Sequence, residues 1–372
     1  MAELLKNIYN ADFYQQLATV LTKCLPDFDQ ALFTELIFSK DWPEKKLKER
    51  MKHTSHVLHH FMPSDFMKAA KILTDLVAQL QQAGIEEETI EYMFIPDYIE
   101  KYGLDDFEPS VRLMATVTQF TSCEYAVRPF LRKYGSQMIG QMRQWSTHPH
   151  DKVRRLASEG SRPRLPWGLG VAMLKEDPSL ILPILENLKT DPSLVVRRSV
   201  ANNLNDIAKD HPDFVLAIMQ EWRHISPETN WIIRHGSRTL LKKANPKALQ
   251  YYGLKDDAAL QLHLLELSAN QVRVGESLEF SFTLINQRSD SRLLRLEYGI
   301  DYLLANDRYN RKIYQISERT LQPKEQVAFS CKRSFKPITT RKFYPGLHHL
   351  VVIVNGAVRQ KLPFMLVDNR AT

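Results

Sequence analysis

DPSLVVRRSVANNLNDIAKDHP, residues 191–212, is the segment that shows most plainly how this chain folds. Its apolar side chains recur at three- and four-residue spacing and share one face of a helix: Val196, Val200, Leu204 and Ile207. A second edge carries polar side chains one turn apart: Arg198, Asn202 and Asp206. The pattern predicts a helix that buries the first face and leaves the second edge for another purpose.

A Val-Arg or Ile-Arg pair recurs along the helical part of the chain. The pairs are Val111-Arg112, Val153-Arg154, Val196-Arg197 and Ile233-Arg234, so the arginines lie 42, 43 and 37 residues apart. A period of this length, with one helix pair in each repeat, is typical of HEAT-type repeats, which stack into a solenoid with a long concave surface. Prolines between the apolar runs mark helix starts and turns. The sequence therefore predicts an all-α HEAT-like solenoid over residues 1–255.

The pattern changes after residue 258. Short runs rich in β-branched and aromatic residues, many of them alternating, cover residues 261–268, 276–286, 292–304, 311–316, 326–333 and 348–354. Asn355-Gly356 then separates the last of these runs from one further run, AVRQKLPF, which is a strong hairpin signal. Seven or so strands in this length predict an all-β immunoglobulin-like sandwich over residues 259–372. Only Cys331 lies in it, so the disulfide between the sheets of antibody domains is excluded.

Composition excludes several classes of protein. No apolar run approaches the length that a membrane span needs. Charged and polar residues occupy the N-terminus where a signal peptide has its apolar centre. Three cysteines, Cys24, Cys123 and Cys331, lie far apart, which fits a reducing compartment. We therefore expect a cytoplasmic monomer with no membrane partner.

The charge of the chain is unevenly distributed. Residues 259–372 hold 17 Lys and Arg against 10 Asp and Glu, which accounts for the whole formal charge of +7. A basic domain attached to a neutral one suggests a polyanionic partner, with nucleic acid the first candidate. The alternative is a sandwich that is simply rich in basic residues. Its densest basic groups, which we expect beside a DNA backbone, are Lys332, Arg333, Lys336, Arg341 and Lys342.

DKVRRLASEGSRPRLPW, residues 151–167, has the character of a site. Its helical part buries one stripe: Val153, Leu156, Ala157 and Gly160. Arg155 and Glu159, four residues apart, share the opposite edge. The helix breaks at Gly160 and Pro163 and leads to Trp167. The next repeat places Asp206 on the matching edge, so we expect Glu159 and Asp206 to converge; the alternative is a solvent-exposed Arg155–Glu159 ion pair of little energy.

Three other groups admit a functional interpretation. His56 and His60 are spaced to bind zinc from one helix, but no third ligand is evident, so a packed or surface helix is favoured and no metal is expected. The basic run at Lys45–Lys52 is a solvated helix face or a phosphate contact. Trp222 and Trp231 are expected to pack in the core.

Three segments resemble the AlkC branch of the HEAT-like repeat alkylpurine DNA glycosylases. They are VRRLASEGSRPRLPWG, DPSLVVRRSVANNLNDIAKDHP and NWIIRHGSRTLLKK, and the first is the most distinctive. Some members of that branch also carry an immunoglobulin-like C-terminal domain. The resemblance implies excision of bases alkylated at N3, chiefly 3-methyladenine and 3-methylcytosine, from a duplex that is bent while the base stays stacked.

The resemblance also assigns residues to the site. It makes Glu159 and Asp206 the catalytic carboxylates, with Trp167 and Arg155 beside them. Glu124 is a further candidate, although it equally fits an acidic residue in the first turn of a helix capped by Ser122. The residues expected to contact DNA from the solenoid are Arg155, Arg162, Arg164, Arg198, His235 and Arg238.

These residue types suit the implied chemistry. An N3-alkylated base is cationic and leaves without protonation, so no general acid, metal or redox cofactor is needed. Carboxylates stabilise the oxocarbenium-like sugar and position a water, and a tryptophan ring attracts the cation. The function expected is a DNA glycosylase acting on duplex DNA. The alternative is a non-catalytic solenoid adaptor that binds structured DNA or protein.

Overall fold

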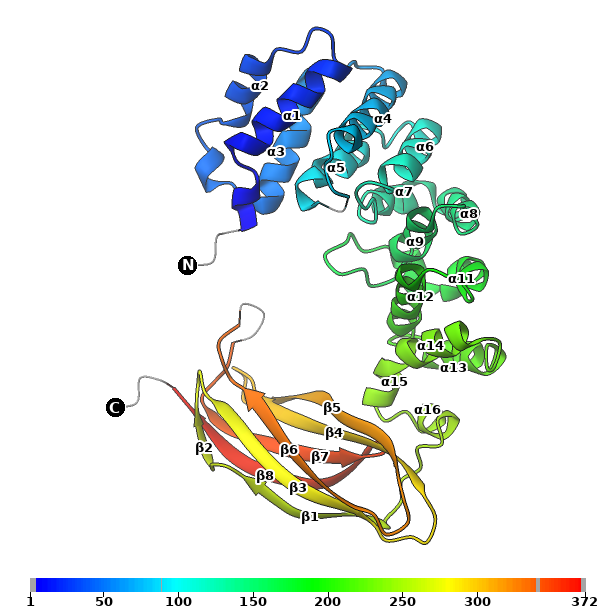
Figure 1. The fold of residues 1–372 in the computed structure, drawn as a ribbon, viewed down its shortest axis with the longest axis vertical. Helices are drawn as coiled ribbons and strands as arrows, with labels where there is room; N and C mark the ends of the chain where they lie inside the picture. The colour runs from blue at the N-terminus through cyan, green and yellow to red at the C-terminus, as the bar shows by residue number, and fades with distance from the viewer. Residues whose placement is uncertain (1–4, 88, 339–341, 369–372) are drawn as a thin grey trace. The chain divides into compact units, whose positions relative to one another are not determined.

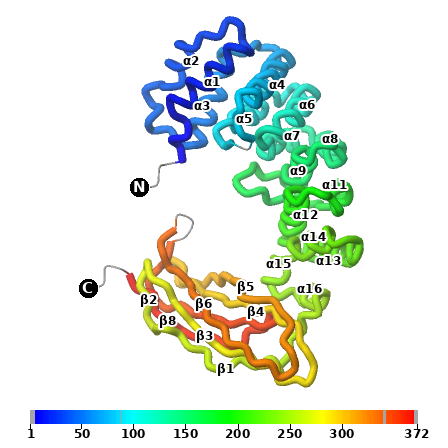
Figure 2. Tube along the Cα trace, viewed as in Figure 1, coloured from blue at the N-terminus to red at the C-terminus, as the bar shows by residue number. Residues whose placement is uncertain are grey.

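The chain divides into two compact units, Met1–Ser237 and Arg238–Thr372. The computed structural model describes residues 5–87, 89–338 and 342–368. The first unit is helical and the second is built mainly of β-strands (Figures 1 and 2). The expected fold class, an α-solenoid followed by an immunoglobulin-like sandwich, is confirmed.

The helices of the first unit follow one another as a stack (Figure 1). Its α-helices are α1 Ala11–Cys24, α2 Gln30–Ile37, α3 Leu47–His60, α4 Phe66–Gln82, α5 Phe94–Tyr102, α6 Phe107–Val117, α7 Val127–Tyr134, α8 Ser136–Trp145, α9 Asp151–Gly160, α10 Ala172–Glu176, α11 Leu182–Leu188, α12 Leu194–Ile207, α13 Pro212–Glu221 and α14 Pro227–Gly236. Short 3-10 helices are η1 Leu5–Ile8, η2 Trp42–Glu44, η3 Ile90–Met93 and η4 Pro178–Ile181. α12 packs against both α9 and α14.

Local sequence explains where these helices begin. Asp29, Asp65 and Ser226 accept hydrogen bonds from backbone N–H groups in the first turns of α2, α4 and α14. Pro212 and Pro227 occupy the first position of α13 and α14, where the missing N–H has no cost. Prolines therefore mark helix starts here, as the sequence predicted.

The recurring arginines hold neighbouring repeats together. Arg154 donates from Nε and Nη2 to the carboxylate of Asp191, at 2.6 and 3.1 Å, and from Nη1 to the carbonyls of His148 and Pro149. Arg197, one repeat later, donates in the same way to the carbonyls of Asp191 and Pro192. Each arginine thus donates hydrogen bonds to backbone carbonyls in the turn before its own helix. Arg154 also links α9 to the turn before α12 through Asp191.

The predicted apolar stripes of α9 and α12 are buried. Those of α9 are Val153, Leu156, Ala157 and Gly160, and those of α12 are Val196, Val200, Leu204 and Ile207. Gly160 ends α9 and also permits close packing, because a Cβ there would lie 2.5 Å from Cγ2 of Val127 on α7. Trp222 is buried as expected, whereas Trp231 is partly exposed.

The second unit begins with two short helices and continues as a sandwich. Its elements are α15 Arg238–Lys242, α16 Pro246–Tyr251, β1 Leu260–Leu267, β2 Gln271–Arg273, β3 Ser277–Asn286, β4 Arg292–Leu303, β5 Tyr309–Leu321, β6 Gln326–Ser334, β7 Gly346–Val354 and β8 Ala357–Val367. The sheets have the orders β1-β3-β6 and β2-β8-β7-β4-β5. β2 was not predicted because three residues are too few to show alternation.

The predicted hairpin joins β7 to β8. Asn355 and Gly356 both have positive φ, 50° and 81°, as the tight turn between paired Val354 and Ala357 requires. The same turn contacts the short helices, because a Cβ on Gly356 would lie 2.8 Å from Leu249 Cδ1. This packing places α15 and α16 with the sandwich, so the division at Ser237 lies before the boundary of 255 that the composition suggested.

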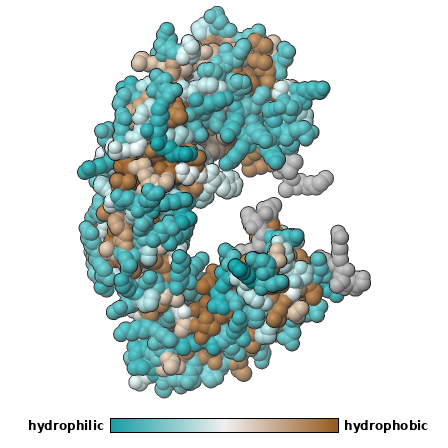
Figure 3. All heavy atoms as spheres, turned by 180° about the vertical axis from the view of Figure 1, so that it is seen from behind, coloured by the Kyte–Doolittle hydropathy of each residue, from teal (hydrophilic) through white to brown (hydrophobic). Residues whose placement is uncertain are grey.

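None of the helices in the described part of the chain combines the length and apolarity that a membrane crossing needs. Figure 3 shows hydrophilic side chains over most of the visible face, with apolar side chains in separate patches.

Candidate active site

A loop leaves the helix stack where α9 ends. The hydroxyl of Ser161 donates to the carbonyls of Ala157 and Ser158, which closes the last turn of the helix. Residues 161–171 then form the excursion expected from Gly160 and Pro163, and Figure 1 shows it projecting beside α9. The residues of interest lie at the base of this loop and at its tip.

A buried arginine joins the two candidate carboxylates at the base of the loop. Arg162 donates from Nη1 to Glu159 Oε1 at 2.6 Å and from Nε to Asp206 Oδ2 at 2.8 Å. The exposed fractions are 8% for Arg162, 6% for Glu159 and 1% for Asp206. The structure thus brings Glu159 and Asp206 to one guanidinium group, although they come from different repeats.

Each carboxylate also has a second partner. Ser199 on α12 donates from Oγ to Glu159 Oε2 at 2.7 Å, and Lys209 donates to Asp206 Oδ1 at 2.8 Å. Burial acts to lower the pKa of Arg162, but Glu159 and Asp206 outweigh it and the pKa is raised. The cluster is therefore a set of buried charges that stabilise one another.

This geometry corrects two expectations. Glu159 and Asp206 were placed on unburied edges of their helices, but both are buried, because the loop folds Arg162 against them. Arg162 was expected to hold a phosphate, but its guanidinium is committed to the carboxylates. A helical wheel could show neither, because it omits the chain that covers the helix.

Arg155 pairs with Glu124 and not with Glu159. It donates from Nη2 to Glu124 Oε2 at 2.7 Å and from Nη1 to the hydroxyl of Ser122 at 3.1 Å. The alternative of an exposed Arg155–Glu159 pair is therefore wrong. Glu124 precedes α7, which begins at Val127, so it is not in a first turn capped by Ser122. Glu124 instead binds Arg155, which lies one turn before Glu159 on α9.

Trp167 lies at the tip of the loop in an unusual backbone conformation. Gly168 donates its backbone N–H to the carbonyl of Leu165 at 3.1 Å, and Trp167 has a φ of 63°. With Pro166 second and a positive φ third, this has the pattern of a type II turn, whose third position favours glycine. A tryptophan there costs roughly 1–2 kcal/mol. Its side chain is nevertheless 84% exposed, so packing does not explain the residue.

Two side chains connect the tip of the loop to the carboxylates. The ammonium of Lys48, on α3, lies 5.5 Å from the ring centroid of Trp167 and 5.9 Å from that of Tyr125. Burial raises the pKa of Tyr125, and the nearby negative charges of Glu124 and Glu159 raise it further. The charges of both glutamates therefore act on Tyr125, and the cation that faces Trp167 lies over its ring.

The remaining basic residues that were expected in the solenoid differ in their partners and exposure. Arg164 makes a two-pronged ion pair with Asp210, at 2.9 and 2.6 Å. Arg198 is exposed on α12. His235 stacks on Trp231 with ring centroids 5.1 Å apart. Arg238 starts α15 and so belongs to the second unit.

The basic candidates of the sandwich are likewise unequal. Lys332 pairs with Glu279 at 2.7 Å. Arg333 donates to the hydroxyl of Tyr302 and lies 4.3 Å from the ring centroid of Tyr314. Lys336 and Lys342 are exposed, whereas Arg341 lies outside the described residues. Lys332, Lys336 and Lys342 are thus exposed, and Lys332 already pairs with a carboxylate.

Sequence reasoning missed three polar residues of this region: Arg128, Ser199 and Lys209. Ser199 interrupts the apolar face of α12 between Val196 and Val200, which was a usable signal. Arg128 is a buried charge between apolar neighbours on α7. Lys209 follows Asp206 by three residues, a spacing too common on surfaces to stand out.

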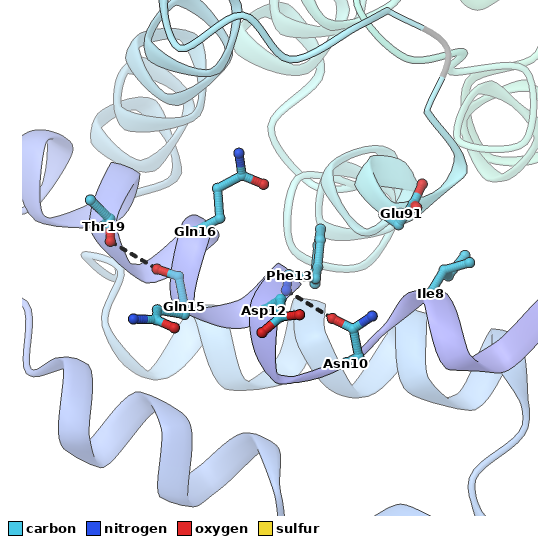
Figure 4. A pocket seen from close by; sticks show the side chains of 8 residues that line it. All are labelled: Ile8, Asn10, Asp12, Phe13, Gln15, Gln16, Thr19 and Glu91. Atoms are coloured by element: carbon cyan, nitrogen blue, oxygen red, sulfur yellow. Dashed lines mark hydrogen bonds between the residues drawn. The ribbon is translucent and has the colours of Figure 1, made fainter.

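The described residues hold no group of three or more His, Cys, Asp or Glu side chains arranged to bind a metal ion. His56 instead contacts the hydroxyl of Tyr102, at 3.2 Å, and His59 that of Tyr98. A polar depression of about 560 Å³ lies between α1 and η3 (Figure 4). Its charged lining residues, Asp12 and Glu91, are acidic, so it does not suit a phosphate backbone.

Comparisons with known proteins find relatives of both parts of the chain. Residues 61–240 match the family described as "DNA alkylation repair enzyme", and residues 261–368 match the "Uncharacterised protein YhaZ, C-terminal Ig-like domain" family. "Uncharacterized protein YhaZ" of Bacillus subtilis is 42% identical over 98% of this chain and 100% of its own length. The Pseudomonas fluorescens alkylpurine DNA glycosylase AlkC, solved bound to DNA containing an abasic site analogue, is 35% identical with a TM-score of 0.91, covering 98% of this chain and 100% of that one.

Proposed function

The chain belongs to the AlkC branch of the HEAT-like repeat alkylpurine DNA glycosylases, and we propose that it hydrolyses the N-glycosidic bond of N3-alkylated cationic bases in duplex DNA. The substrates are 3-methyladenine and 3-methylcytosine. The observation that carries the proposal is the pair Glu159 and Asp206, held by buried Arg162 at the base of the loop that exposes Trp167.

The buried Arg162 preorganises the two carboxylates. Because both bind one guanidinium, they are held in fixed positions, and a positive charge that develops nearby meets them without reorganisation. A carboxylate has about four acceptor positions, so the two hydrogen bonds that Glu159 accepts leave room for a water or a sugar. Glu124 is a third carboxylate, held by Arg155, which lies one turn before Glu159 on α9.

The reaction needs little from the enzyme beyond electrostatics and a water. An N3-methylated base carries its own positive charge and leaves with the electrons of the glycosidic bond, so the base needs no proton. The sugar becomes oxocarbenium-like, and water adds to C1′ while its proton passes to a carboxylate. Glu159 and Asp206 stabilise the developing cation, and one of them orients the water.

Trp167 is proposed to face the damaged nucleotide from outside the base stack. A ring that is 84% exposed on a projecting turn reaches a nucleotide that stays in the duplex. A base extruded from the duplex is held in a pocket instead. The ammonium of Lys48 lies 5.5 Å from the centroid of this ring, which supports the ring as a place for a cation.

The direct test is base release. The protein is incubated with a duplex that holds a single 3-methyladenine or 3-methylcytosine, and abasic sites are scored as alkali-labile breaks. Release above the spontaneous rate supports the proposal. Tight duplex binding without release of any N3-alkylated base contradicts it and favours the adaptor.

Replacing Trp167 with alanine is expected to slow base release without destabilising the protein. The loss is about 10-fold, corresponding to a cation–π contact of about 1–2 kcal/mol. Because the ring is exposed, the unfolding free energy should change by no more than about 0.5 kcal/mol. Single-turnover release and urea unfolding are the measurements, with Leu169→Ala, exposed in the same loop, as the control. An unchanged release rate removes Trp167 from the mechanism.

The basic sandwich is proposed to bind the DNA backbone through its accessible lysines. Lys336→Ala should reduce the dependence of log affinity on log salt by about 0.9, the value for one phosphate contact in B-DNA. Fluorescence anisotropy between low and moderate salt measures this slope. Lys71→Ala, which removes an exposed lysine from α4, is the matched control. Equal slopes for Lys336→Ala and the unmodified protein exclude that contact.

A further inference from the structure

Arg128 on α7 grips both ends of the loop that carries Trp167. It donates from Nε to the carbonyl of Leu169 at 2.8 Å, and from Nη1 to the carbonyls of Gly160 and Arg162 at 2.9 and 2.7 Å. Gly160 and Arg162 lie where the loop leaves α9, and Leu169 lies two residues beyond Trp167. A single guanidinium therefore closes the base of the loop.

The buried environment of Arg128 places strict geometric requirements on these hydrogen bonds. The residue is 1% exposed, and it donates hydrogen bonds to three backbone carbonyls. Burial, followed by the charge of Arg162, lowers the pKa of Arg128 to about 10, so the group stays charged at neutral pH. A planar fork can reach three carbonyls in fixed directions, which the flexible ammonium of a lysine does not reproduce.

The hydrogen bonds of Arg128 involve both parts of the candidate site, the carboxylate cluster and the turn that carries Trp167. The carbonyl of Arg162 belongs to the residue whose side chain holds Glu159 and Asp206. The carbonyl of Leu169 follows the turn that keeps Trp167 in a left-handed conformation. Strained backbone of this kind persists only where the surrounding structure determines it.

We propose that Arg128 is a positioning residue that sets Trp167 relative to the Glu159–Asp206 pair by clamping the loop between them. Arg128 contacts neither DNA nor the reacting atoms in this role. It makes the rate of base release depend on the geometry of the loop, while the affinity for DNA depends on it less. The catalytic part of this inference rests on the proposed glycosylase function; the clamp itself does not.

The clamp can be tested without any activity. Trypsin cuts after arginine unless proline follows, so Arg164-Leu165 is a cleavable bond at the loop tip, whereas Arg162-Pro163 is not. In the full-length protein, Arg128→Lys should speed cleavage after Arg164 several-fold, as mass spectrometry of the fragments shows. Arg132→Lys, an exposed change one turn along α7, should leave it unchanged. Equal cleavage in Arg128→Lys and the unmodified protein overturns the clamp.

A double-mutant cycle tests the positioning role. Arg128→Lys is expected to lower the single-turnover rate of base release by about 10-fold, and by less than about 3-fold in a Trp167→Ala background, because coupled residues are not additive. Affinity for a duplex with an abasic-site analogue should stay within about 3-fold, since coupling to the rate alone is proposed. The same loss in both backgrounds overturns the positioning role.

The two experiments separate this inference from the proposed function. Base release absent from the unmodified protein would overturn the glycosylase, whereas faster cleavage of Arg128→Lys would still support the clamp. Arg128→Met extends the series by removing the charge. If that variant does not fold, Arg128→Lys, whose folding is checked by circular dichroism, carries the test.

Discussion

Replacing Asp206 with asparagine is expected to slow base release on the order of 10²-fold or more while the protein stays folded. Asparagine keeps the shape of the side chain and can still accept from Arg162, but it removes the negative charge that would face the developing cation. Glu159→Gln is expected to behave similarly, since Glu159 binds the same guanidinium. Single-turnover release from a duplex with one 3-methyladenine is the measurement.

The controls for these variants follow from the structure. Asp210→Asn makes the same chemical change at the partly exposed partner of Arg164 and should leave release almost unchanged. Alanine is a poor choice at Glu159 or Asp206, because both are buried and truncation would leave Arg162 with an unbalanced charge. Full activity in both Asp206→Asn and Glu159→Gln would show that catalysis lies elsewhere.

Arg162→Met is expected to cause the largest loss of stability. Methionine fills part of the space but leaves two buried carboxylates without their shared cation, and breaking a buried ion pair in this way costs about 3–5 kcal/mol. Lys209 still donates to Asp206 in this variant, whereas Glu159 loses its cationic partner, so the unbalanced negative charge falls mainly on Glu159. The unfolding free energy from urea titration measures the effect.

Arg164→Met provides the matched control for Arg162→Met. Arg164 lies two residues away and also makes an ion pair, with Asp210, but both partners are accessible to solvent. Surface pairs of this kind contribute about 0–1 kcal/mol. A loss below about 1 kcal/mol in Arg162→Met would mean that the cluster is hydrated or readily rearranged, contrary to its burial.

The region 151–171 shows which features of the site a local sequence pattern can predict. Neighbouring residues are enough to predict three of its features: the buried apolar stripe of α9, the end of the helix at Gly160 and the position of Trp167 beyond the helix. The partner of Arg155 could not be predicted, because Glu124 lies 31 residues earlier and competes with Glu159, four residues away. Spacing on a helix identifies which groups are able to pair, whereas tertiary packing chooses among them.

Arg162 illustrates the same limit for burial. An arginine between a serine and a proline in a polar segment has the character of a surface residue. Its burial results from the loop folding back over α9 and α12, where Asp206 lies 44 residues away in the chain. The role of Arg128 could not be predicted from the sequence for the same reason, because its acceptors are backbone carbonyls, which every residue type has.

The sequence by itself determined the repeating helices, the change to strands after residue 258, the hairpin at Asn355-Gly356 and the two repeats from which the site is drawn. Each depends on interactions within a few residues: periodicity, turn preference and the spacing of the Val-Arg pairs. Only the tertiary structure decided that Glu159 and Asp206 share a buried arginine, that Arg155 belongs to Glu124 and that Arg128 closes the loop beneath Trp167. These depend on contacts between residues 31 to 44 positions apart, or on the burial of charge, and such contacts exist only once the repeats have packed.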